Sequence, residues 1–523
     1  MTSVTISDTM HLRDRLERLI PLFLVIGVLL AAILSITPWP VGAYEDDAIY
    51  TVLAKALATG DGYRMINLPG APHATHYPPG YPFLLSLLWR VWPEFPDNVV
   101  VFKFANAVLL AVAAVAMYRF MRSRLDYRPL GAALIAIAGT VSITMLQLAG
   151  LVLSEPLFVA LLFLSLPAIE RTVSDGDGRH AAAAGMLLGA LTMVRTIGVV
   201  AIAATIVMLL VHRRLLALGI FVIATAFFLV PWQLWVGAHQ AEIAPILTGK
   251  YGSYSTWLLD GYREGSTSFA RTVIVQNLAS LGRTMSYLVM PVTRRWVTIV
   301  SLLVLVPTIV GGLILLVKRA PVMVAFCVLY IGLIVVWPFD PYRFLLALWP
   351  VLVVAAAAAA RGAWQWRPES PLPRVARGLA LGAVAYLVAG HAAYNWRMHQ
   401  GQTWTWLQRK AGLSSKPLVE WVDRYTRPDD VLSTEHDVLV YLYTGRRGVP
   451  TSTFLASQRA KPFTAADNVH WMGTMVRSFE PRYLVTGWPA HIDAADTLSA
   501  GPAPILRRLG AIPNHVIYER VVQ

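Results

Sequence analysis

The 523-residue chain is 56% hydrophobic and only 14% charged, with a mean hydropathy of +0.56. Because soluble domains carry about a quarter charged residues, this composition excludes a soluble globular protein and predicts a polytopic helical membrane protein. The net charge of +14 fits Lys and Arg in cytoplasmic loops, not a nucleic-acid partner. The single cysteine, Cys327, excludes an internal disulfide and a cysteine metal site.

The N-terminus is polar and basic, with Arg13, Arg15 and Arg18 ahead of the first apolar run. This order is similar to a signal peptide. No convincing small-residue cleavage site precedes the acidic stretch, however, and many apolar runs follow, which favours an uncleaved first helix. We expect a first span over about 20–37, ended by Pro38, with the N-terminus in the cytoplasm.

The first outer loop, 38–98, contains three consecutive carboxylates in the sequence YEDDAIY (44–50), followed by HYPPGYP (76–82). Carboxylates at the mouth of a membrane span are costly to place and usually have a function. The pattern predicts two short interfacial helices, over 47–59 and 82–92. Between them, the proline pair prevents a helix from starting before Gly80.

The remaining spans follow from the alternation of apolar runs and basic clusters. They cover about 99–118, 130–148, 154–170, two shorter spans within 181–211, 215–236, 298–317, 321–337, 343–360 and 378–395. With about eleven spans, every basic cluster falls on the cytoplasmic side. A second long outer loop, 237–297, is rich in Gly, Ser, Tyr and Trp and carries Lys250 and Tyr251 near its start.

This count divides the chain into a transmembrane domain, 1–395, and a C-terminal domain, 396–523, on the outer face. Short apolar strands alternate with helical stretches in the C-terminal domain. The strands are expected at 431–434, 482–486 and 515–519, and the helices at 416–426 and 464–478. The pattern predicts a small α/β domain.

Several polar residues lie near the outer ends of the spans: Asp46, Asp47, His73, His76, Glu155, Arg195, Asp340 and Arg343. Each alone could solvate a helix end, but their gathering on one side favours a site. Asp46 and Asp47 also suit the positive end of a short helix, and this reading accounts for Asp47 without catalysis. His76 is a candidate metal ligand, although a hydrogen-bonding role fits it equally well.

Two arginines need an anionic partner. Arg195 lies deep in an apolar stretch, where an unpaired guanidinium is prohibitive, so it requires a carboxylate or an anionic ligand. Arg343 follows a short turn at Asp340-Pro341. It could pair with Asp340, or it could hold a phosphate through its fork of donors.

In chain order, these features resemble the C-type superfold of membrane glycosyltransferases. The similarity is to the branch that uses polyprenyl-phosphate sugars, which includes protein O-mannosyltransferases and aminoarabinose transferases. It covers roughly residues 20–360 and rests on DDAIY (46–50), HYPPGYPFLL (76–85), LSEPL (153–157) and YRFLL (342–346).

The resemblance implies that Asp46 is the catalytic base and that Glu155 is the second acidic residue, with Asp47 beside Asp46 where protein mannosyltransferases commonly have Glu. Arg343, together with Arg195, is implied for the donor phosphate. The substrate loops would contain His76, Tyr77, Tyr81, Lys250 and Tyr251. His76 occupies the place of a metal-binding acidic residue in some relatives, which leaves both a metal-assisted and a metal-independent reaction open.

The expected function is therefore an inverting glycosyltransferase in the bacterial inner membrane. It would move a sugar from a polyprenyl-phosphate donor to a protein, glycan or lipid acceptor outside. One alternative is a flippase or transporter of a lipid-linked substrate, which is weakened because no internal repeat is visible. Another is a non-catalytic envelope assembly protein that works through its C-terminal domain.

Overall fold

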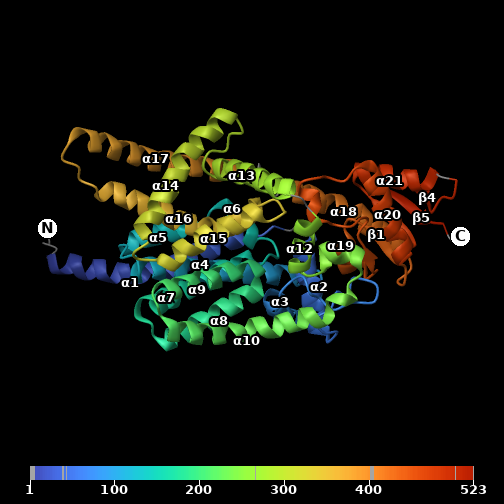
Figure 1. Cartoon of the computed structure of the whole chain (residues 1–523), viewed down its shortest axis with the longest axis horizontal. Helices are drawn as coiled ribbons and strands as arrows, with labels where there is room; N and C mark the ends of the chain where they lie inside the picture. The colour runs from blue at the N-terminus through green and yellow to red at the C-terminus, as the bar shows by residue number, and fades with distance from the viewer. Residues whose placement is uncertain are drawn as a thin grey trace.

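The computed structural model describes residues 6–37, 40–42, 44–264, 267–400, 406–500 and 502–521. Pro38, which we expected to end the first span, lies outside these residues, as do the side chains of Arg13 and Arg15. Long helices make up most of the molecule, and a small α/β region forms its right-hand end in Figure 1.

Every apolar run that was expected to span the membrane is helical. The bundle contains α1 (Ile6–Leu34), α4 (Val99–Ser123), α5 (Pro129–Thr140), α6 (Ile143–Ala149), α7 (Glu155–Asp175), α8 (Gly178–Val194), α9 (Val199–Val211), α10 (Leu215–His239), α13 (Thr267–Val289), α14 (Arg295–Leu316), α15 (Pro321–Val336), α16 (Tyr342–Gln365) and α17 (Pro371–His399). Seven described helices are long and apolar enough to cross a membrane, or eight if α5 and α6, bent by 62°, make one span. The chain is a multi-pass helical membrane protein, but the expected count of about eleven spans is not confirmed.

The difference in the count comes from short helices. Two apolar helices, Thr196–Val211 and Pro321–Val336, fall below the length of about 20 residues that a straight span needs. Helix α8 has only 17 residues. Helix α13 differs in the opposite way, because it places 23 helical residues in the second outer loop, where the sequence analysis predicted no helix.

The first outer loop contains the two short helices that were predicted. They are α2 (Asp46–Thr59) and α3 (Gly80–Val91), which pack against each other. Helix α3 begins directly after Pro79, as the proline pair dictates. Pro82 is tolerated in its first turn because the N–H that it lacks has no partner within the helix at that position.

The C-terminal region has one five-stranded sheet in the order β2-β1-β3-β5-β4. Its strands are β1 (Leu432–Thr434), β2 (Gly448–Val449), β3 (Tyr483–Thr486), β4 (Leu506–Ile512) and β5 (His515–Arg520). Strand β1 runs parallel to β2 and β3, whereas β5 pairs antiparallel with β3 and β4. The flanking helices are α18 (Trp406–Tyr425), α19 (Asp437–Thr444), α20 (Ala465–Phe479) and α21 (Pro489–Ala500). The three predicted strands are confirmed, and β2 and β4 are additions.

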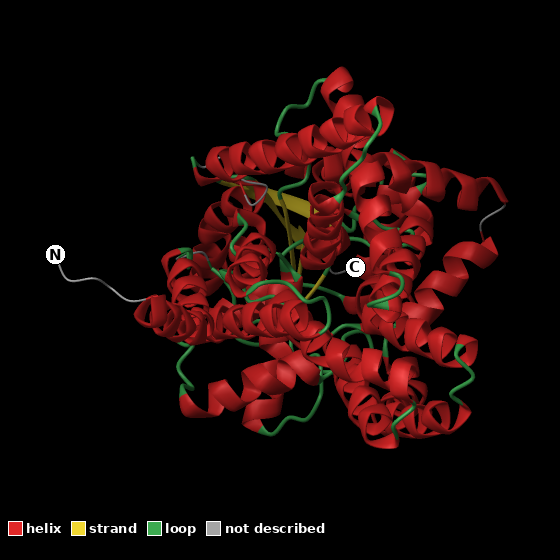
Figure 2. Ribbon diagram, turned by 90° about the vertical axis from the view of Figure 1, so that its left-hand side faces the viewer, coloured by secondary structure: helices red, strands yellow, loops and turns green. Residues whose placement is uncertain are grey.

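The basic residues of the predicted inner loops meet at one end of the bundle. Arg124 Nε donates to the carbonyl of Arg319 (2.8 Å), and Arg361 donates to the carbonyl of Leu125 (2.7 Å). The sheet lies toward the other end, and Figure 2 shows its strands behind the helices when the molecule is viewed from the N-terminal side. This separation agrees with the predicted topology, while the orientation of the termini remains a prediction.

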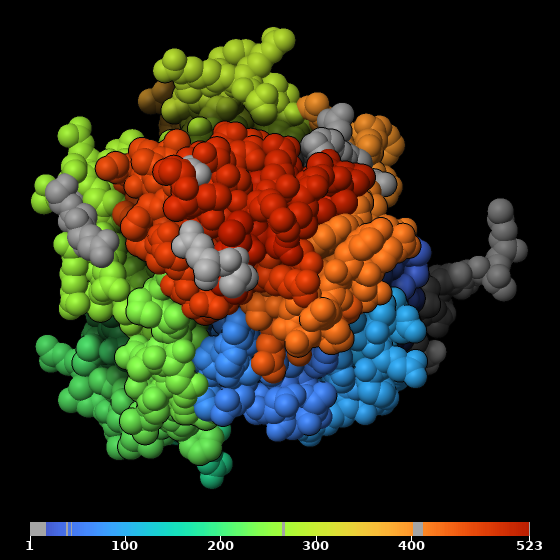
Figure 3. Space-filling model, turned by 90° about the vertical axis from the view of Figure 1, so that its right-hand side faces the viewer, coloured from blue at the N-terminus to red at the C-terminus, as the bar shows by residue number. Residues whose placement is uncertain are grey.

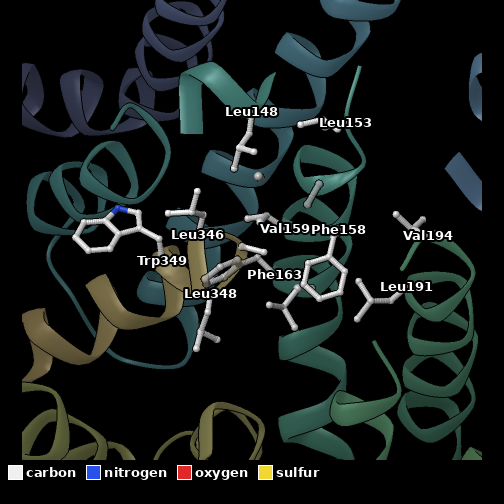
Figure 4. Packing of buried hydrophobic residues seen from close by; sticks show 14 of the residues in the cluster. Leu148, Leu153, Phe158, Val159, Phe163, Leu191, Val194, Leu346, Leu348 and Trp349 are labelled. Carbon is white, nitrogen blue, oxygen red and sulfur yellow. The ribbon is translucent and has the colours of Figure 1, made fainter. Parts of the chain in front are cut away.

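Buried hydrophobic side chains hold α7 against α8 and α16. Figure 4 shows Phe158 and Phe163 of α7 near side chains of the two neighbouring helices, Leu191 of α8 and Leu346 of α16. These four side chains are at most 3% exposed. Close packing of this kind leaves little freedom of movement, so the first turns of α7 and α16 have fixed positions.

Candidate active site

Arg343 joins two carboxylates that come from distant parts of the chain. It lies in the first turn of α16, and its Nη1 is 2.6 Å from Oδ2 of Asp46, the first residue of α2. Its Nε is 2.8 Å from Oε1 of Glu155, the first residue of α7. Both carboxylates occupy helix N-termini, where the helix dipole favours negative charge. Three predicted site residues are therefore in direct contact.

Arg195 lies on the other side of Glu155, at the break between α8 and α9. Its Nη1 is 2.9 Å from Oε1 of Glu155 and 3.1 Å from the Ser154 hydroxyl, which also bonds Tyr50 at 3.0 Å. The Glu155 side chain is completely buried. Glu155 is thus the carboxylate partner that the buried Arg195 required.

The expected alternative for Arg343, a pair with Asp340, is wrong. The Asp340 carboxylate instead accepts hydrogen bonds from the Ser280 hydroxyl (2.7 Å) and the Tyr342 amide (3.1 Å), and it lies 3.5 Å from Arg459. Because Asp340 belongs to the turn before α16 and Arg343 to its first turn, the helix directs the two side chains differently. Sequence proximity suggested a pair that the helix geometry does not make.

Some polar atoms in this cluster are buried without a partner. Within the described part of the chain, Nη2 of Arg343, Nε of Arg195 and Oε2 of Glu155 make no hydrogen bond. Buried polar groups are nearly always satisfied, so an unpartnered donor on a buried guanidinium indicates that an acceptor is missing from this cluster. An anionic oxygen is a suitable acceptor for a hydrogen bond that Arg343 Nη2 donates.

Tyrosines form one wall of the cluster. The Tyr77 hydroxyl donates to Oδ1 of Asp46 at 2.7 Å. The Tyr50 ring packs edge-on against Tyr77 and Tyr81, with centroids 5.3 and 5.0 Å apart. Tyr81 is fully buried and donates to Asn106. Tyr77 therefore contacts the proposed base directly, whereas Tyr81 supports the wall from behind.

Asp47 faces the backbone and not the cluster. Its carboxylate accepts hydrogen bonds from the amides of Gly42 (3.0 Å), Tyr44 (3.2 Å) and Ala48 (2.9 Å), and its side chain is 1% exposed. Burial raises the pKa of Asp47 to about 6, against the opposing effect of these amides. These contacts support the structural alternative for Asp47, which is to hold the turn that precedes α2.

The residue between Tyr44 and Asp46 has an unusual backbone. Glu45 has φ 61° and ψ −60°, and the Asp46 amide donates to the Tyr44 carbonyl at 2.6 Å, which defines a γ-turn. A non-glycine residue in this conformation is strained and persists only where its surroundings impose it. The strained turn sits directly before the carboxylate that contacts Arg343.

His76 makes contacts that leave it neutral. Its Nδ1 donates to the Gly252 carbonyl, and its ring lies 3.7 Å from the ring of Tyr254. Burial lowers the pKa of His76 to about 4, despite the nearby charge of Asp46. These contacts correspond to the hydrogen-bonding alternative for His76.

The residues around Asp46 do not fit a divalent metal. Asp46 and Glu155 are already balanced by the guanidinium groups of Arg195 and Arg343, and a dication between them would be repelled. Among the described His, Cys, Asp and Glu side chains, one group has a spacing that could hold a metal ion, and this group does not include His76. The metal-assisted alternative is therefore not supported by the residues around Asp46.

Lys250 and Tyr251 contact the C-terminal region. Lys250 Nζ is 2.7 Å from Oδ1 of Asp437 and also pairs with Glu45, while the Tyr251 hydroxyl donates to Oδ2 of Asp437. Asp437 begins α19 and is fully buried. Figure 3 shows the C-terminal region lying over this end of the molecule, next to the first outer loop. Two predicted substrate-loop residues thus anchor the C-terminal region to the loop that carries Asp46.

Sequence reasoning missed several residues of this assembly: Tyr50, Ser154, Tyr254 and Asp437. Tyr50 and Ser154 lie inside the motifs that carried the resemblance, so their positions were a usable signal. Asp437 gave no such signal, because its partners lie 186 and 187 residues earlier in the chain.

Solved structures with the same fold as this chain include two crystal structures of ArnT from Cupriavidus metallidurans, one in the apo state and one bound to undecaprenyl phosphate. Both give a TM-score of 0.55 and cover 96% of this chain, with 12% and 13% identity, and they are covered over 97% and 98% of their own lengths. No protein-family model and no curated protein sequence matches the chain. The similarity extends over both the bundle and the C-terminal region, and the expected C-type glycosyltransferase fold is confirmed.

Proposed function

We propose that this protein transfers a sugar from a polyprenyl-phosphate donor to an acceptor at the outer face of the inner membrane. The observation that carries the proposal is Arg343, held between Asp46 and Glu155 with a buried nitrogen that lacks a partner among the described residues. The fold adds support, because an ArnT structure of this fold has undecaprenyl phosphate bound. The acceptor can be a protein, a glycan or a lipid.

In the proposed reaction, Asp46 acts as the base. The acceptor hydroxyl oxygen forms a bond to the anomeric carbon, and the bond from that carbon to the phosphate oxygen breaks with its electron pair. The acceptor proton goes to Asp46, and polyprenyl phosphate leaves. A positioned base of this kind contributes about 100- to 10,000-fold. A single displacement inverts the anomeric configuration.

Arg343 and Arg195 would stabilise the charge on the departing phosphate. Arg343 has a free nitrogen for this purpose, while Glu155 fixes the orientation of both guanidinium groups. Preorganised donors of this kind cost no reorganisation at the moment of reaction. Asp47 would position the turn before α2, and Tyr77 would position the side chain of Asp46.

The topology belongs to the same proposal. We assign residues 1–395 to the transmembrane part and 396–523 to an extracytoplasmic domain, with the N-terminus in the cytoplasm. The contacts of Asp437 with Lys250 and Tyr251 support an outer domain that works together with the membrane part.

The test compares wild-type protein with Asp46→Asn in liposomes. The liposomes contain lipid extract from a strain that lacks the gene and was grown with radiolabelled sugar, so that the donor lipid carries the label. We expect wild-type protein to move label from the polyprenyl-phosphate lipid to a second species, and Asp46→Asn to fail while it inserts normally. Label that crosses the bilayer without leaving the lipid would indicate a flippase instead. Equal transfer by both proteins would refute Asp46 as the base.

A further inference from the structure

We propose that His73, His239 and Glu242 form a binding site for one zinc-like divalent cation, which joins the first outer loop to the end of α10. One potential ligand atom from each residue lies within 4.8 Å of the other two. The site is distinct from the Asp46 cluster and does not depend on the proposed function.

His73 already contacts the side chains of both His239 and Glu242. The rings of His73 and His239 have centroids 4.1 Å apart, and Nδ1 of His73 is 2.8 Å from both oxygens of Glu242. The side chains of His73 and Glu242 are 17% and 39% exposed. A cation can therefore reach the cluster from solvent without a change in the fold.

A backbone contact orients His239 for metal binding. Its Nδ1 is 2.9 Å from the carbonyl oxygen of Trp235, one turn earlier in α10. A carbonyl oxygen can only accept, so Nδ1 carries the proton and Nε2 keeps its lone pair. Metal-binding histidines characteristically make such a contact through the nitrogen that does not bind the metal.

The other two residues are also held in place. The backbone amide of His73 donates to Oε2 of Glu242 at 3.0 Å, and His73 forms an isolated β-bridge with Arg64. Next to it, the Ala74 carbonyl accepts a hydrogen bond from Trp235 Nε1 at 3.0 Å. The loop and α10 are therefore already joined beside the cluster, which reduces the ordering that metal binding requires.

The donor set selects the kind of cation. Two imidazoles and one carboxylate suit Zn²⁺ and similar transition metals, whereas Mg²⁺ and Ca²⁺ prefer an all-oxygen site. Zinc–nitrogen bonds of about 2.0 Å in a tetrahedral site place ligand atoms roughly 3.3 Å apart. Small side-chain rotations achieve this from the present spacing, and three protein ligands leave a fourth position for water.

The site has a structural consequence for the Asp46 cluster. His73 lies four residues before Tyr77, whose hydroxyl donates to Asp46. A cation bound to His73 would fix the loop that leads to Tyr77 by linking it to α10. The cation would act as a clip and take no part in bond making or breaking.

The test uses full-length protein purified in detergent through a tag that contains no histidine, then stripped with EDTA. The protein is dialysed against micromolar zinc sulfate, and bound zinc is measured by mass spectrometry together with the unfolding midpoint. We expect about one zinc per wild-type chain, and zinc should raise its midpoint. His239→Ala and Glu242→Gln should bind zinc at least about tenfold more weakly, because each removes a ligand.

His212→Ala is the matched control. His212 follows α9, and its Nδ1 is 2.9 Å from the carbonyl of Met208, the same backbone contact that His239 makes. This variant should bind zinc as the wild type does. Equal midpoints of all four proteins in EDTA would show that the variants are folded. The proposal is overturned if wild-type protein binds no more zinc than Glu242→Gln, or if His212→Ala loses zinc equally.

Discussion

Replacing Asp437 by Asn tests whether the C-terminal region holds the loop that carries Asp46. The Asp437 carboxylate is fully buried and accepts from both Lys250 and Tyr251. Removing one charge of a buried pair costs about 3–5 kcal/mol, because the other charge stays buried. Lys250 keeps one contact, with the half-exposed Glu45, and exposed pairs contribute at most about 1 kcal/mol. We therefore expect a loss of about 3 kcal/mol at this contact.

Hydrogen–deuterium exchange measures this loss locally. The amides of residues 248–254 and 437–444 should exchange about 100-fold faster in Asp437→Asn, because about 1.4 kcal/mol corresponds to a tenfold change in an opening equilibrium. Amides of the α7–α16 contact should keep their rates, since their packing does not involve Asp437.

Asp423→Asn is the control for the Asp437 experiment. Asp423, like Asp437, pairs with a cationic side chain, in its case Arg446, but the Asp423 side chain is 69% exposed. Loss of a surface pair should change exchange by less than about fivefold. Unchanged exchange in Asp437→Asn, or an equal increase in Asp423→Asn, would refute the view that this buried contact anchors the loop.

Three further predictions concern the site itself. Arg343→Lys should raise the apparent KM for the donor by at least about tenfold, because an ammonium lacks the fork of donors that can hold Glu155 and a phosphate at the same time; an unchanged KM in the liposome transfer assay would exclude the phosphate role. Asp46→Asn should lose about 100- to 10,000-fold in transfer rate, yet bind undecaprenyl phosphate as tightly as wild-type protein or up to about tenfold more tightly; weaker binding would show that the charge of Asp46 does not oppose a phosphate at Arg343. His76 has a folded pKa of about 4, below the unfolded value of about 6.5, so its contribution to stability is complete above about pH 6.5. That contribution should fall by up to about 3 kcal/mol as the pH falls toward 4. In denaturant titrations His76→Gln should lack this component, and an identical pH dependence in both proteins would refute it.

The sequence predicted the helical elements and the members of the Asp46 cluster well, because both depend on local signals. Apolar runs mark the helices, and polar residues inside or beside them are costly enough to be informative. Asp46, Glu155, Arg195 and Arg343 stood out on this ground, and the structure brings them into contact. The span count was less reliable because apolar helices such as Pro321–Val336 are too short for the length criterion.

Pairings between distant segments could not be read from the chain. Asp340 is the acidic residue nearest to Arg343 in the sequence. The acidic partners of Arg343 in the structure, however, lie 188 and 297 residues away from it along the chain. Lys250 likewise looked like a substrate-loop residue, because Asp437 lies far along the chain. Strand β4 was missed because most of its residues are exposed and give no apolar alternation. Tertiary packing decides these features, and a single sequence contains no record of it.

The charges around Arg343 suggest how donor binding would prepare the base. Two carboxylates and two guanidinium groups sum to zero, so a phosphate bound at Nη2 of Arg343 would add negative charge and weaken the hold of Arg343 on its carboxylates. Glu155 is fully buried and contacts both arginines, whereas Asp46 is 27% exposed and contacts only one of the two arginines, Arg343. Releasing Glu155 would leave a buried charge unpaired, which is far more costly than releasing Asp46 toward solvent. Under the proposed mechanism, Asp46 would therefore be the carboxylate that Arg343 releases, and it would become free to accept a proton when the donor is bound.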